Sequence, residues 1–334
     1  MRFYSGFAES FYYAYRYGPS LYERARPVKV EALCDAVSRV RDVRSTRLAE
    51  AGVFAPLAGP GCLEPSEAGC HHVLVPRTSN RRKTGGLVRH CWDSPIPPGS
   101  FVLSGPGIYV STPEFTFLQL ARELDMVSLV LVGCALCASY TLDPKTEKVR
   151  GREPITSVER LSCFLKGASG IHGVARARRA LRQVADGAES PQEINMFLMM
   201  SLQPALGGRG IDGLKLNYVI DVKDTDAGIV DRADRRFARI DMGVPDQNAG
   251  AEYLGKHHER QVDADRNRLI FLLAKGERVL QAKYADLSDP VKANRLANQL
   301  ERILGRGSDE PTPSEMLARE KLSNTLFGAG RMQI

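Results

Sequence analysis

Two short apolar segments that each carry one carboxylate constrain the fold of this chain more than any other feature. Residues 240–244 (Ile-Asp-Met-Gly-Val) contain Asp241, and residues 250–253 (Gly-Ala-Glu-Tyr) contain Glu252. The residues between the two segments, Pro-Asp-Gln-Asn-Ala-Gly, are turn formers. This pattern predicts two strands joined as a hairpin or near-hairpin. Asp241 and Glu252 would then lie on neighbouring strands.

Carboxylates held so close together repel each other unless a cation or a proton relieves the repulsion. Mg²⁺ binds one or two carboxylates together with water and phosphate oxygens, and metal ions of this kind assist phosphodiester hydrolysis. The alternative interpretation is that both carboxylates face solvent, as acidic side chains usually do.

From residue 189 to residue 283 the predicted order of elements is helix, three strands, helix and strand. This order resembles the PD-(D/E)xK restriction-endonuclease-like superfamily, and more narrowly its branch related to the very-short-patch repair endonuclease. The residues that fit the pattern of this branch are Asp241, Glu252, Gly255, His258, Asp265, Arg268, Gly276, Val279 and Leu280.

The resemblance implies an α/β fold in which a mixed sheet is flanked by helices. It also implies a DNA hydrolase that uses Mg²⁺ or Mn²⁺, with Asp241 and Glu252 as metal ligands and Glu193 assisting. His258 or Lys256 would orient water or stabilise the charge that develops on the phosphate.

Leu254 departs from the family pattern, because the branch has Asp at this position and the wider superfamily has Lys. Side chains alternate along a strand, so residues 252, 254 and 256 would project to one side. Lys256 could therefore replace the missing lysine, unless Gly255 ends the strand and turns Lys256 into solvent. If catalysis has been lost, the alternative function is a nuclease-fold DNA-binding or toxin–antitoxin-type regulatory protein.

Glu193 has two possible roles. Ser190, Pro191 and Glu193 stand at the positions of a helix N-cap, first residue and capping-box acid. The family resemblance places an acidic residue here too, pointing into the metal site. One carboxylate cannot easily serve both the helix cap and a metal ion. The sequence does not decide between these two roles.

The N-terminal part resembles a different family. Its residues 73–76 (Val-Leu-Val-Pro), 107–114 (Gly-Ile-Tyr-Val-Ser-Thr-Pro-Glu) and 118–122 (Leu-Gln-Leu-Ala-Arg) resemble the domain that adjoins such nuclease-like modules in AbiEi-type antitoxin-like regulators. We therefore expect a smaller α+β domain before the endonuclease-like one. The expected divisions are an α+β domain over 1–150, a helical connector over 151–188, the endonuclease-like domain over 189–305, and a linker and C-terminal tail over 306–334, with a loosely attached helix at 314–326.

The chain carries a formal net charge of +7 and has a pI near 9.0. These values favour DNA as a partner, although proteins without a polyanionic partner share them. The residues expected to contact phosphates are Arg81, Arg82, Lys83, Arg176, Arg179 and Arg268. The first three lie between two predicted strands, where the alternative is a solvated hairpin tip. The arginines at 176 and 179 belong to a basic helix that could equally be solvated. A protein partner or a homodimer is a further possibility.

Seven scattered cysteines without a disulfide framework favour a reducing cytoplasm. The longest apolar run, residues 126–138, is too short for a membrane span and predicts a buried helix. Cys134 and Cys137 lie in this run, where small buried side chains are the better interpretation than a metal site. No membrane association is expected. The scatter of Cys62, Cys70, His71, His72, His90 and Cys91 matches no familiar zinc-ligand spacing.

Overall fold

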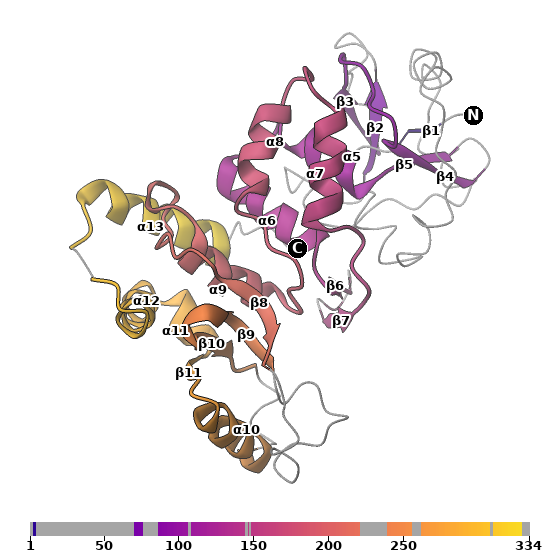
Figure 1. Cartoon of the computed structure of the whole chain (residues 1–334). Coiled ribbons are helices and arrows are strands. Elements are labelled where there is room, and N and C mark those ends of the chain that lie inside the picture. The colour runs from indigo at the N-terminus through magenta and orange to yellow at the C-terminus, as the bar shows by residue number, and fades with distance from the viewer. Residues whose placement is uncertain are drawn as a thin grey trace. The chain divides into compact units, whose positions relative to one another are not determined.

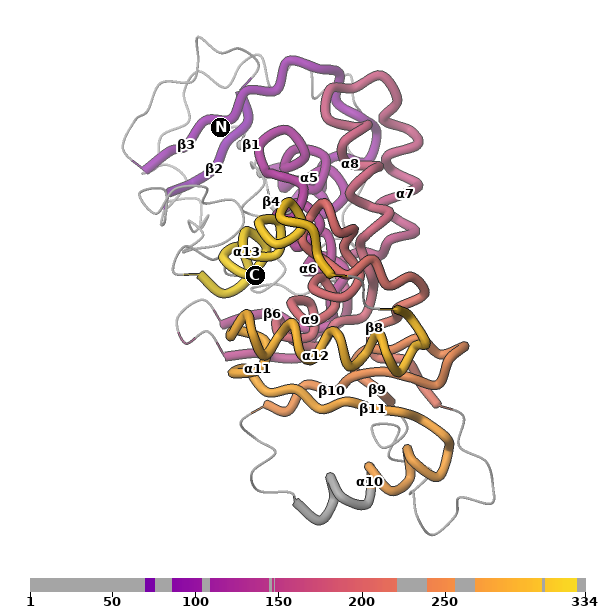
Figure 2. Tube along the Cα trace, turned by 90° about the vertical axis from the view of Figure 1, so that its left-hand side faces the viewer, coloured from indigo at the N-terminus to yellow at the C-terminus, as the bar shows by residue number. Residues whose placement is uncertain are grey.

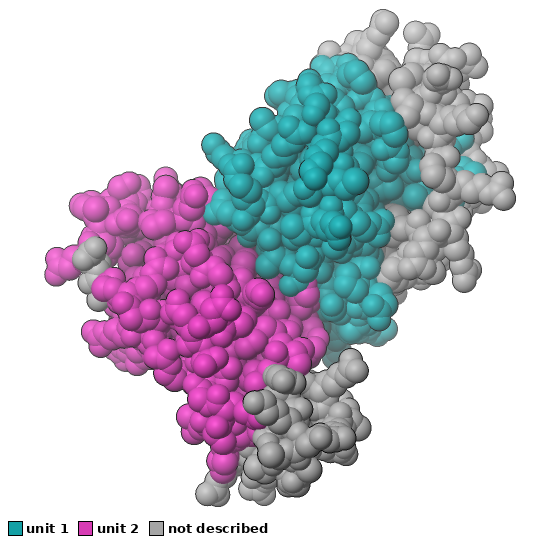
Figure 3. Space-filling model, viewed as in Figure 1, with its two compact units in different colours: residues 1–186, 332–334 teal, residues 187–331 magenta. Residues whose placement is uncertain are grey.

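The structure is a computed structural model that describes residues 3–4, 70–75, 86–105, 108–143, 146, 148–220, 239–255, 262–307 and 310–328. The chain divides into two compact units, shown in Figure 3. Unit 1 comprises residues 1–186 with 332–334, and unit 2 comprises residues 187–331. Both contain helices and small sheets, so the expected mixed α/β class is confirmed. Unit 1, expected to be the smaller, is the longer of the two.

The strands on either side of the basic segment 77–83 pair in an unexpected direction. Strand β2 (His71–Val75) and strand β3 (Leu87–Cys91) are parallel, with His71 opposite Leu87. A hairpin would make them antiparallel, so the prediction of a simple strand–turn–strand is wrong. The physical reason is that parallel strands need a connection that returns to the starting end of the sheet, which a tight turn cannot provide.

The other described strands of unit 1 form two more small sheets. Strands β4 (Phe101–Gly105) and β5 (Ile108–Ser111) pair antiparallel. β5 also pairs in parallel with the two-residue β1 (Phe3–Tyr4). The antiparallel pair of β6 (Tyr140–Leu142) and β7 (Val149–Gly151) was not predicted.

Helix α5 (Pro113–Leu120) begins at Pro113, because the Thr112 hydroxyl accepts a hydrogen bond from the Phe115 amide and Pro113 occupies the first turn. Helix α6 (Met126–Leu136) is the expected buried helix. Cys134 is fully buried within it, and burial raises the pKa of the Cys134 thiol to about 12. No helix among the described residues is both long and apolar enough to cross a membrane.

The segment expected as a helical connector contains two helices, α7 (Val158–Gly167) and α8 (Val174–Leu181). They pack against α5 and α6 and against each other. Leu161 and Leu165 of α7 are buried in this packing. The segment expected as a connector is thus part of the core of unit 1.

The four strands predicted for unit 2 form one mixed sheet, as expected. They are β8 (Lys215–Val219), β9 (Arg239–Val244), β10 (Ala249–Tyr253) and β11 (Arg278–Ala282). The spatial order is β11-β10-β9-β8, in which β10 is parallel to β11 and antiparallel to β9. Strand β8 pairs antiparallel with β9.

The predicted hairpin joins β9 to β10 through the short 3-10 helix η6 (Pro245–Gln247). Asn248, with φ of 47°, provides the left-handed residue that closes the turn. Gly243 and Gly250 face each other in this hairpin. A side chain on Gly250 would put its Cβ 2.4 Å from the carbonyl oxygen of Met242. The close approach of the two strands therefore requires glycine.

Helices lie on both sides of this sheet (Figures 1 and 2). Helix α9 (Pro191–Ser201) packs against β9. Helix α10 (Val262–Ala274) lies on the opposite side, where its Phe271 and Leu272 form a buried cluster with Tyr218 and Ile240. Burial of these apolar side chains holds the sheet between its two helical layers.

The last helices complete unit 2. Helix α11 (Tyr284–Ser288) leads into α12 (Pro290–Ile303), which packs against β10 and β11. Helix α13 (Pro313–Phe327) packs on the 3-10 helix η3 (Pro204–Leu206). The expected C-terminal helix is thus confirmed, but it is not loosely attached.

The contact at Gly207, directly after η3, shows how closely α13 is packed. A Cβ on Gly207 would lie 2.3 Å from the carbonyl oxygen of Ala318. Leu322 and Leu326 of α13 are buried. The prediction of a loosely attached helix was wrong. The backbone of α13 packs directly against Gly207, and no local sequence pattern indicates this contact.

Replacing Gly250 by alanine should destabilise unit 2 by about 1–3 kcal/mol, because the new methyl group would overlap the Met242 carbonyl and the Ile240 side chain. Chemical denaturation followed by far-UV circular dichroism measures the change. Gly307→Ala is the matched control, since a Cβ there meets nothing within 4 Å. Equal stability of the two variants would contradict the proposed close approach.

Candidate functional site

Asp241 lies where the hydrogen-bond ladders on both sides of β9 are interrupted. On one side, the pairing of β9 with β10 ends at Met242 and Ala251. Asp241 and Glu252, the next two residues, are opposite each other but are not paired in the ladder. On the other side the ladder to β8 omits the position where Asn217 would face Asp241. The Asp241 carboxylate occupies the opening towards β10 and accepts a hydrogen bond of 2.9 Å from the Tyr253 amide. The expectation that Asp241 and Glu252 lie on neighbouring strands is confirmed.

Glu252 is buried and forms an ion pair with Arg268 of α10. An Nη atom of Arg268 lies 2.5 Å from Glu252 Oε1, and the same nitrogen donates a hydrogen bond to the carbonyl oxygen of Arg239. Only 20% of the Arg268 side chain and 6% of the Glu252 side chain are exposed. Arg268, expected to bind DNA phosphates, thus turns towards the carboxylates.

Glu193 lies in the first turn of α9, whose N-cap residue is Ser190. Its amide donates to the Ser190 hydroxyl, and its carboxylate accepts hydrogen bonds from that hydroxyl and from the Glu189 amide. The Asn217 side chain adds a third donor to this carboxylate at 2.6 Å. The predicted N-cap at Ser190 is confirmed. The backbone amide that bonds the Glu193 carboxylate is that of Glu189, whereas a capping box would use the Ser190 amide. Both oxygens of Glu193 are engaged.

Asn217 joins the capped end of α9 to the sheet. Its φ of 48° lies in the left-handed region, which interrupts β8. Its amide nitrogen donates to the Gly187 carbonyl as well as to Glu193. One residue thereby links the start of unit 2, the first helix and the strand beside Asp241.

Burial is the largest cause of the raised pKa values of both Asp241 and Glu193. The carboxyl group of Asp241 is closely surrounded although the residue as a whole is only half-buried; the Tyr253 amide and the charges of Arg268 and Arg239 counteract part of the rise. Burial, followed by the Asp241 charge, raises the pKa of Glu193 to about 7. Asp241 and Glu193 are therefore near enough to act on each other electrostatically.

A second buried polar contact lies beside the site. The Tyr218 hydroxyl donates to Glu277 at 2.7 Å. Burial, this hydrogen bond and the charges of Glu277 and Glu252 raise the pKa of Tyr218, which keeps it protonated as a donor. The charge of Glu252 thus acts on Tyr218, which packs against α10.

Several predicted site residues lie outside the described residues: Arg81, Arg82, Lys83, Lys256 and His258. Leu254, at the position of the family lysine, extends the contact with β11 by donating its amide to the Ala282 carbonyl. It offers no charge to the carboxylates. Whether Lys256 reaches them stays a prediction.

The basic helix of unit 1 exposes part of its charge. Arg179 is exposed and Arg176 is half-buried. The neighbouring Arg178 instead donates to the Leu165 carbonyl at 2.6 Å and to Ser169, so its side chain joins α8 to α7. Only part of the arginine cluster is therefore directed to solvent.

Two histidines of unit 1, His72 and His90, form a pair. His72 Nδ1 and His90 Nε2 are 2.8 Å apart, and the two rings stack. Burial, followed by the charge of His71, lowers the pKa of His72 to about 4. Across the described part of the chain, no three or more His, Cys, Asp or Glu side chains gather in an arrangement that could hold a metal ion.

Asp241 and Glu252 would supply a metal ion with two acidic ligands rather than three. Mg²⁺ commonly uses one or two carboxylates and completes its shell with water and phosphate oxygens. The oxygens of Asp241 and Glu252 are therefore suitable donors, and Arg268 already places one positive charge beside both.

Comparison of the chain with models of protein families, with curated proteins and with solved structures yields no match.

Three residues that position the site were not singled out from the sequence: Asn217, Arg239 and Glu189. Arg239 binds Glu189 through both carboxylate oxygens, at 2.5 and 2.6 Å. Asn217 left one local signal, a single amide within the apolar run Leu-Asn-Tyr-Val. The Arg239–Glu189 pair left none, because its partners are fifty positions apart in the chain.

The stability of unit 2 should decrease as the pH rises through the titration of Glu193. Between its ordinary pKa of 4.5 and about 7, the folded chain binds more protons at Glu193 than the unfolded chain does, so ionisation favours unfolding. Glu193→Gln mimics the neutral acid, and it should gain on the wild type by up to about 3 kcal/mol between pH 5 and pH 8. Denaturation at both pH values measures this gain.

Glu320→Gln is the control for this experiment, because Glu320 is exposed on α13. It should leave the pH dependence as it is in the wild type. A Glu193→Gln variant whose stability follows the wild type at both pH values would contradict the raised pKa.

Proposed function

We propose that unit 2 is a metal-dependent nuclease that hydrolyses phosphodiester bonds in DNA. One observation carries the proposal: Asp241 and Glu252 meet where β9 and β10 stop pairing, and the charge of Arg268 acts on both. Two carboxylates gathered around one cation in a largely buried position are suited to binding a divalent metal ion.

The fold of unit 2 supports the proposal. A mixed sheet with helices on both sides, reached through the order helix, three strands, helix and strand, is what the restriction-endonuclease-like resemblance implies. We further propose that unit 2 has the restriction-endonuclease-like fold. Membership of that superfamily predicts a metal site at Asp241 and Glu252.

Asp241 and Glu252 would hold Mg²⁺ or Mn²⁺, which supplies an activated water and stabilises the negative charge that develops on the phosphate. Arg268 would stabilise the same charge through its guanidinium donors once it is released from Glu252. Glu193 would position the site: its carboxylate accepts a hydrogen bond from Asn217, which interrupts the pairing of β8 with β9 next to Asp241. Lys256 or His258 would contribute as further donors.

A catalytically inactive DNA-binding or regulatory protein is the second candidate function. The ion pair of Glu252 with Arg268 favours it, because this contact occupies a proposed metal ligand with an internal cation. Leu254 favours it too, since the superfamily lysine is missing there. The two candidates differ in whether metal and DNA displace Arg268.

Nuclease activity should require Asp241. Purified wild-type protein is incubated with plasmid and with single-stranded DNA in Mg²⁺ or Mn²⁺, and cleavage is followed on gels. Asp241→Asn should lower the rate by at least about 100-fold, because the substitution removes a charged metal ligand. Lys256→Ala should lower it only if this lysine replaces the one missing at Leu254.

Asp246→Asn is the matched control, since Asp246 is exposed in η6 five residues further on. It should cleave like the wild type. Cleavage that survives Asp241→Asn would point to a contaminating nuclease. A folded wild-type protein that cuts neither substrate would favour the inactive binding protein.

Binding of duplex DNA should be weak and sensitive to salt. Each phosphate contact made by an arginine releases counterions, so affinity should fall steeply between about 50 and 200 mM salt. Arg179→Gln should weaken binding and reduce the salt dependence, because Arg179 is exposed on α8. Fluorescence anisotropy with a labelled duplex measures both effects.

Arg295→Gln provides the control, because Arg295 is exposed on α12 and is not among the residues expected to contact DNA. It should bind like the wild type. Affinity that does not change with salt, or no binding at low salt, would contradict a role for DNA as partner.

A further inference from the structure

Three aromatic side chains gather at the carboxyl ends of the parallel strands β10 and β11. They are Tyr253, the last residue of β10, Tyr284, the first residue of α11, and Phe327, the last residue of α13. The rings of Tyr284 and Phe327 meet edge to face, with their centroids 6.0 Å apart. Burial, followed by the charge of a deprotonated Tyr284, raises the pKa of Tyr253, so the two phenols lie near each other. We call these three residues the aromatic cluster.

The aromatic cluster adjoins the proposed nuclease site through Tyr253. This residue follows Glu252 in β10, and its backbone amide donates the 2.9 Å hydrogen bond to Asp241. In β11 the residue paired with Tyr253 is Ala282, which precedes Tyr284 by two positions. Open α/β sheets bind their ligands at the carboxyl ends of parallel strands. A DNA strand with one phosphate at the carboxylates would therefore bring neighbouring nucleotides to the cluster.

The cluster is partly open, and the charges that flank it in the chain have both signs. Tyr284 is 40% exposed, whereas Tyr253 and Phe327 are half-buried. Lys283 is exposed, and Asp286 accepts a hydrogen bond from the Lys283 amide at the start of α11. One cation and one anion give no excess charge to attract a phosphate here. Any contribution to binding must come from the aromatic rings.

An exposed aromatic ring beside a site for phosphodiester hydrolysis is suited to stacking a nucleobase. Such stacking contributes to the binding of single strands and tolerates any sequence, because every base has a π face. In a duplex each base is already stacked and paired, and it has to leave the helix before a side chain can cover its face. The ring of Tyr284 therefore favours DNA whose bases are unpaired.

We propose that the substrate of the nuclease site is single-stranded DNA, and that an unpaired base next to the bound phosphate stacks on Tyr284. This inference rests on the proposed nuclease function. Tyr284 would determine specificity for strandedness and not for base sequence. Phe327 and Tyr253 would support its ring from the side of the protein.

Fluorescence anisotropy of the full-length protein in EDTA tests the proposal without any contribution from cleavage. The probe is labelled oligothymidylate of about 12 nucleotides. A strand of equal length built from abasic sites has the same phosphates but no bases. The wild type should bind oligothymidylate at least about tenfold more tightly than the abasic strand, because only the former can stack.

Two substitutions of Tyr284 separate stacking from packing. Tyr284→Leu keeps an apolar side chain against Phe327 but has no ring, so it should weaken binding of oligothymidylate by about fivefold or more. Tyr284→Phe keeps the ring and should bind like the wild type. A purely structural role would tolerate leucine as well as phenylalanine. Binding of a duplex of the same length should not change in either variant.

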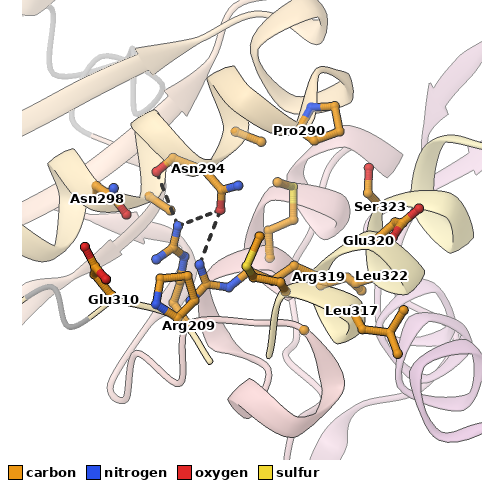
Figure 4. Close-up of a pocket in the computed structure, with 16 residues that line it drawn as sticks. Arg209, Pro290, Asn294, Asn298, Glu310, Leu317, Arg319, Glu320, Leu322 and Ser323 are labelled. Atoms are coloured by element: carbon orange, nitrogen blue, oxygen red, sulfur yellow. Dashed lines mark hydrogen bonds between the residues drawn. The ribbon is translucent and has the colours of Figure 1, made fainter. Parts of the chain in front are cut away.

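Leu317→Ala is the control for the loss of an exposed apolar side chain. Leu317 is 53% exposed on α13, about three turns before Phe327, and lines the pocket that α12 and α13 form around Arg319 (Figure 4). This variant should bind oligothymidylate with the affinity of the wild type.

The proposal is overturned if the wild type binds the abasic strand as tightly as oligothymidylate, or if Tyr284→Leu binds oligothymidylate like the wild type. Equal losses of single-strand and duplex binding in Tyr284→Leu would overturn it too. Cleavage in Mg²⁺ tests the nuclease function separately. Base-dependent binding through Tyr284 without any cleavage would overturn the nuclease function and leave Tyr284 as a DNA-binding residue of the second candidate function.

Discussion

The structure of unit 2 depends on how its buried carboxylates are neutralised. Glu193 is bonded by the cap of α9 and by Asn217, Asp241 by the Tyr253 amide, and Glu252 by Arg268. Each carboxylate needs such partners, because an ionised group without them is strongly destabilising in a protein interior. The interrupted ladders around β9 are a consequence of this requirement. Where the strand pairing is interrupted, the Tyr253 amide binds Asp241 and the Asn217 side chain binds Glu193.

The same contacts explain why stability and the proposed activity oppose each other. A metal ion at Asp241 and Glu252 would take over the neutralisation that Arg268 now provides at Glu252. Arg268 would then need another anion, and a DNA phosphate is a suitable one. Metal and DNA would therefore favour each other's binding. The metal ion would neutralise Glu252 when Arg268 leaves it, and the DNA phosphate would neutralise the released Arg268. Without both, the Arg268–Glu252 ion pair would remain.

Two polar regions of unit 2 combine arginines with acidic side chains. Around Asp241 the carboxylates outnumber the arginines that act on it, Arg268 and Arg239. The pocket at Arg319 is lined by two arginines and two glutamates, Arg209, Arg319, Glu310 and Glu320, so its charges balance. The close contact of α13 with Gly207 makes the second region possible, because it brings Arg319 beside Arg209.

Local patterns in the sequence determined the strands of the unit 2 sheet, the β9–β10 hairpin and the N-cap of α9, because each depends on residues within a few positions of one another. The adjacency of Asp241 and Glu252 followed from the hairpin alone. Only the tertiary structure decided that Arg268 turns inward to Glu252, that Asn217 links Glu193 to the sheet, and that β2 and β3 run parallel. These features depend on which distant side chains and strands packing brings together, and on the free-energy cost of leaving a buried charge unpaired.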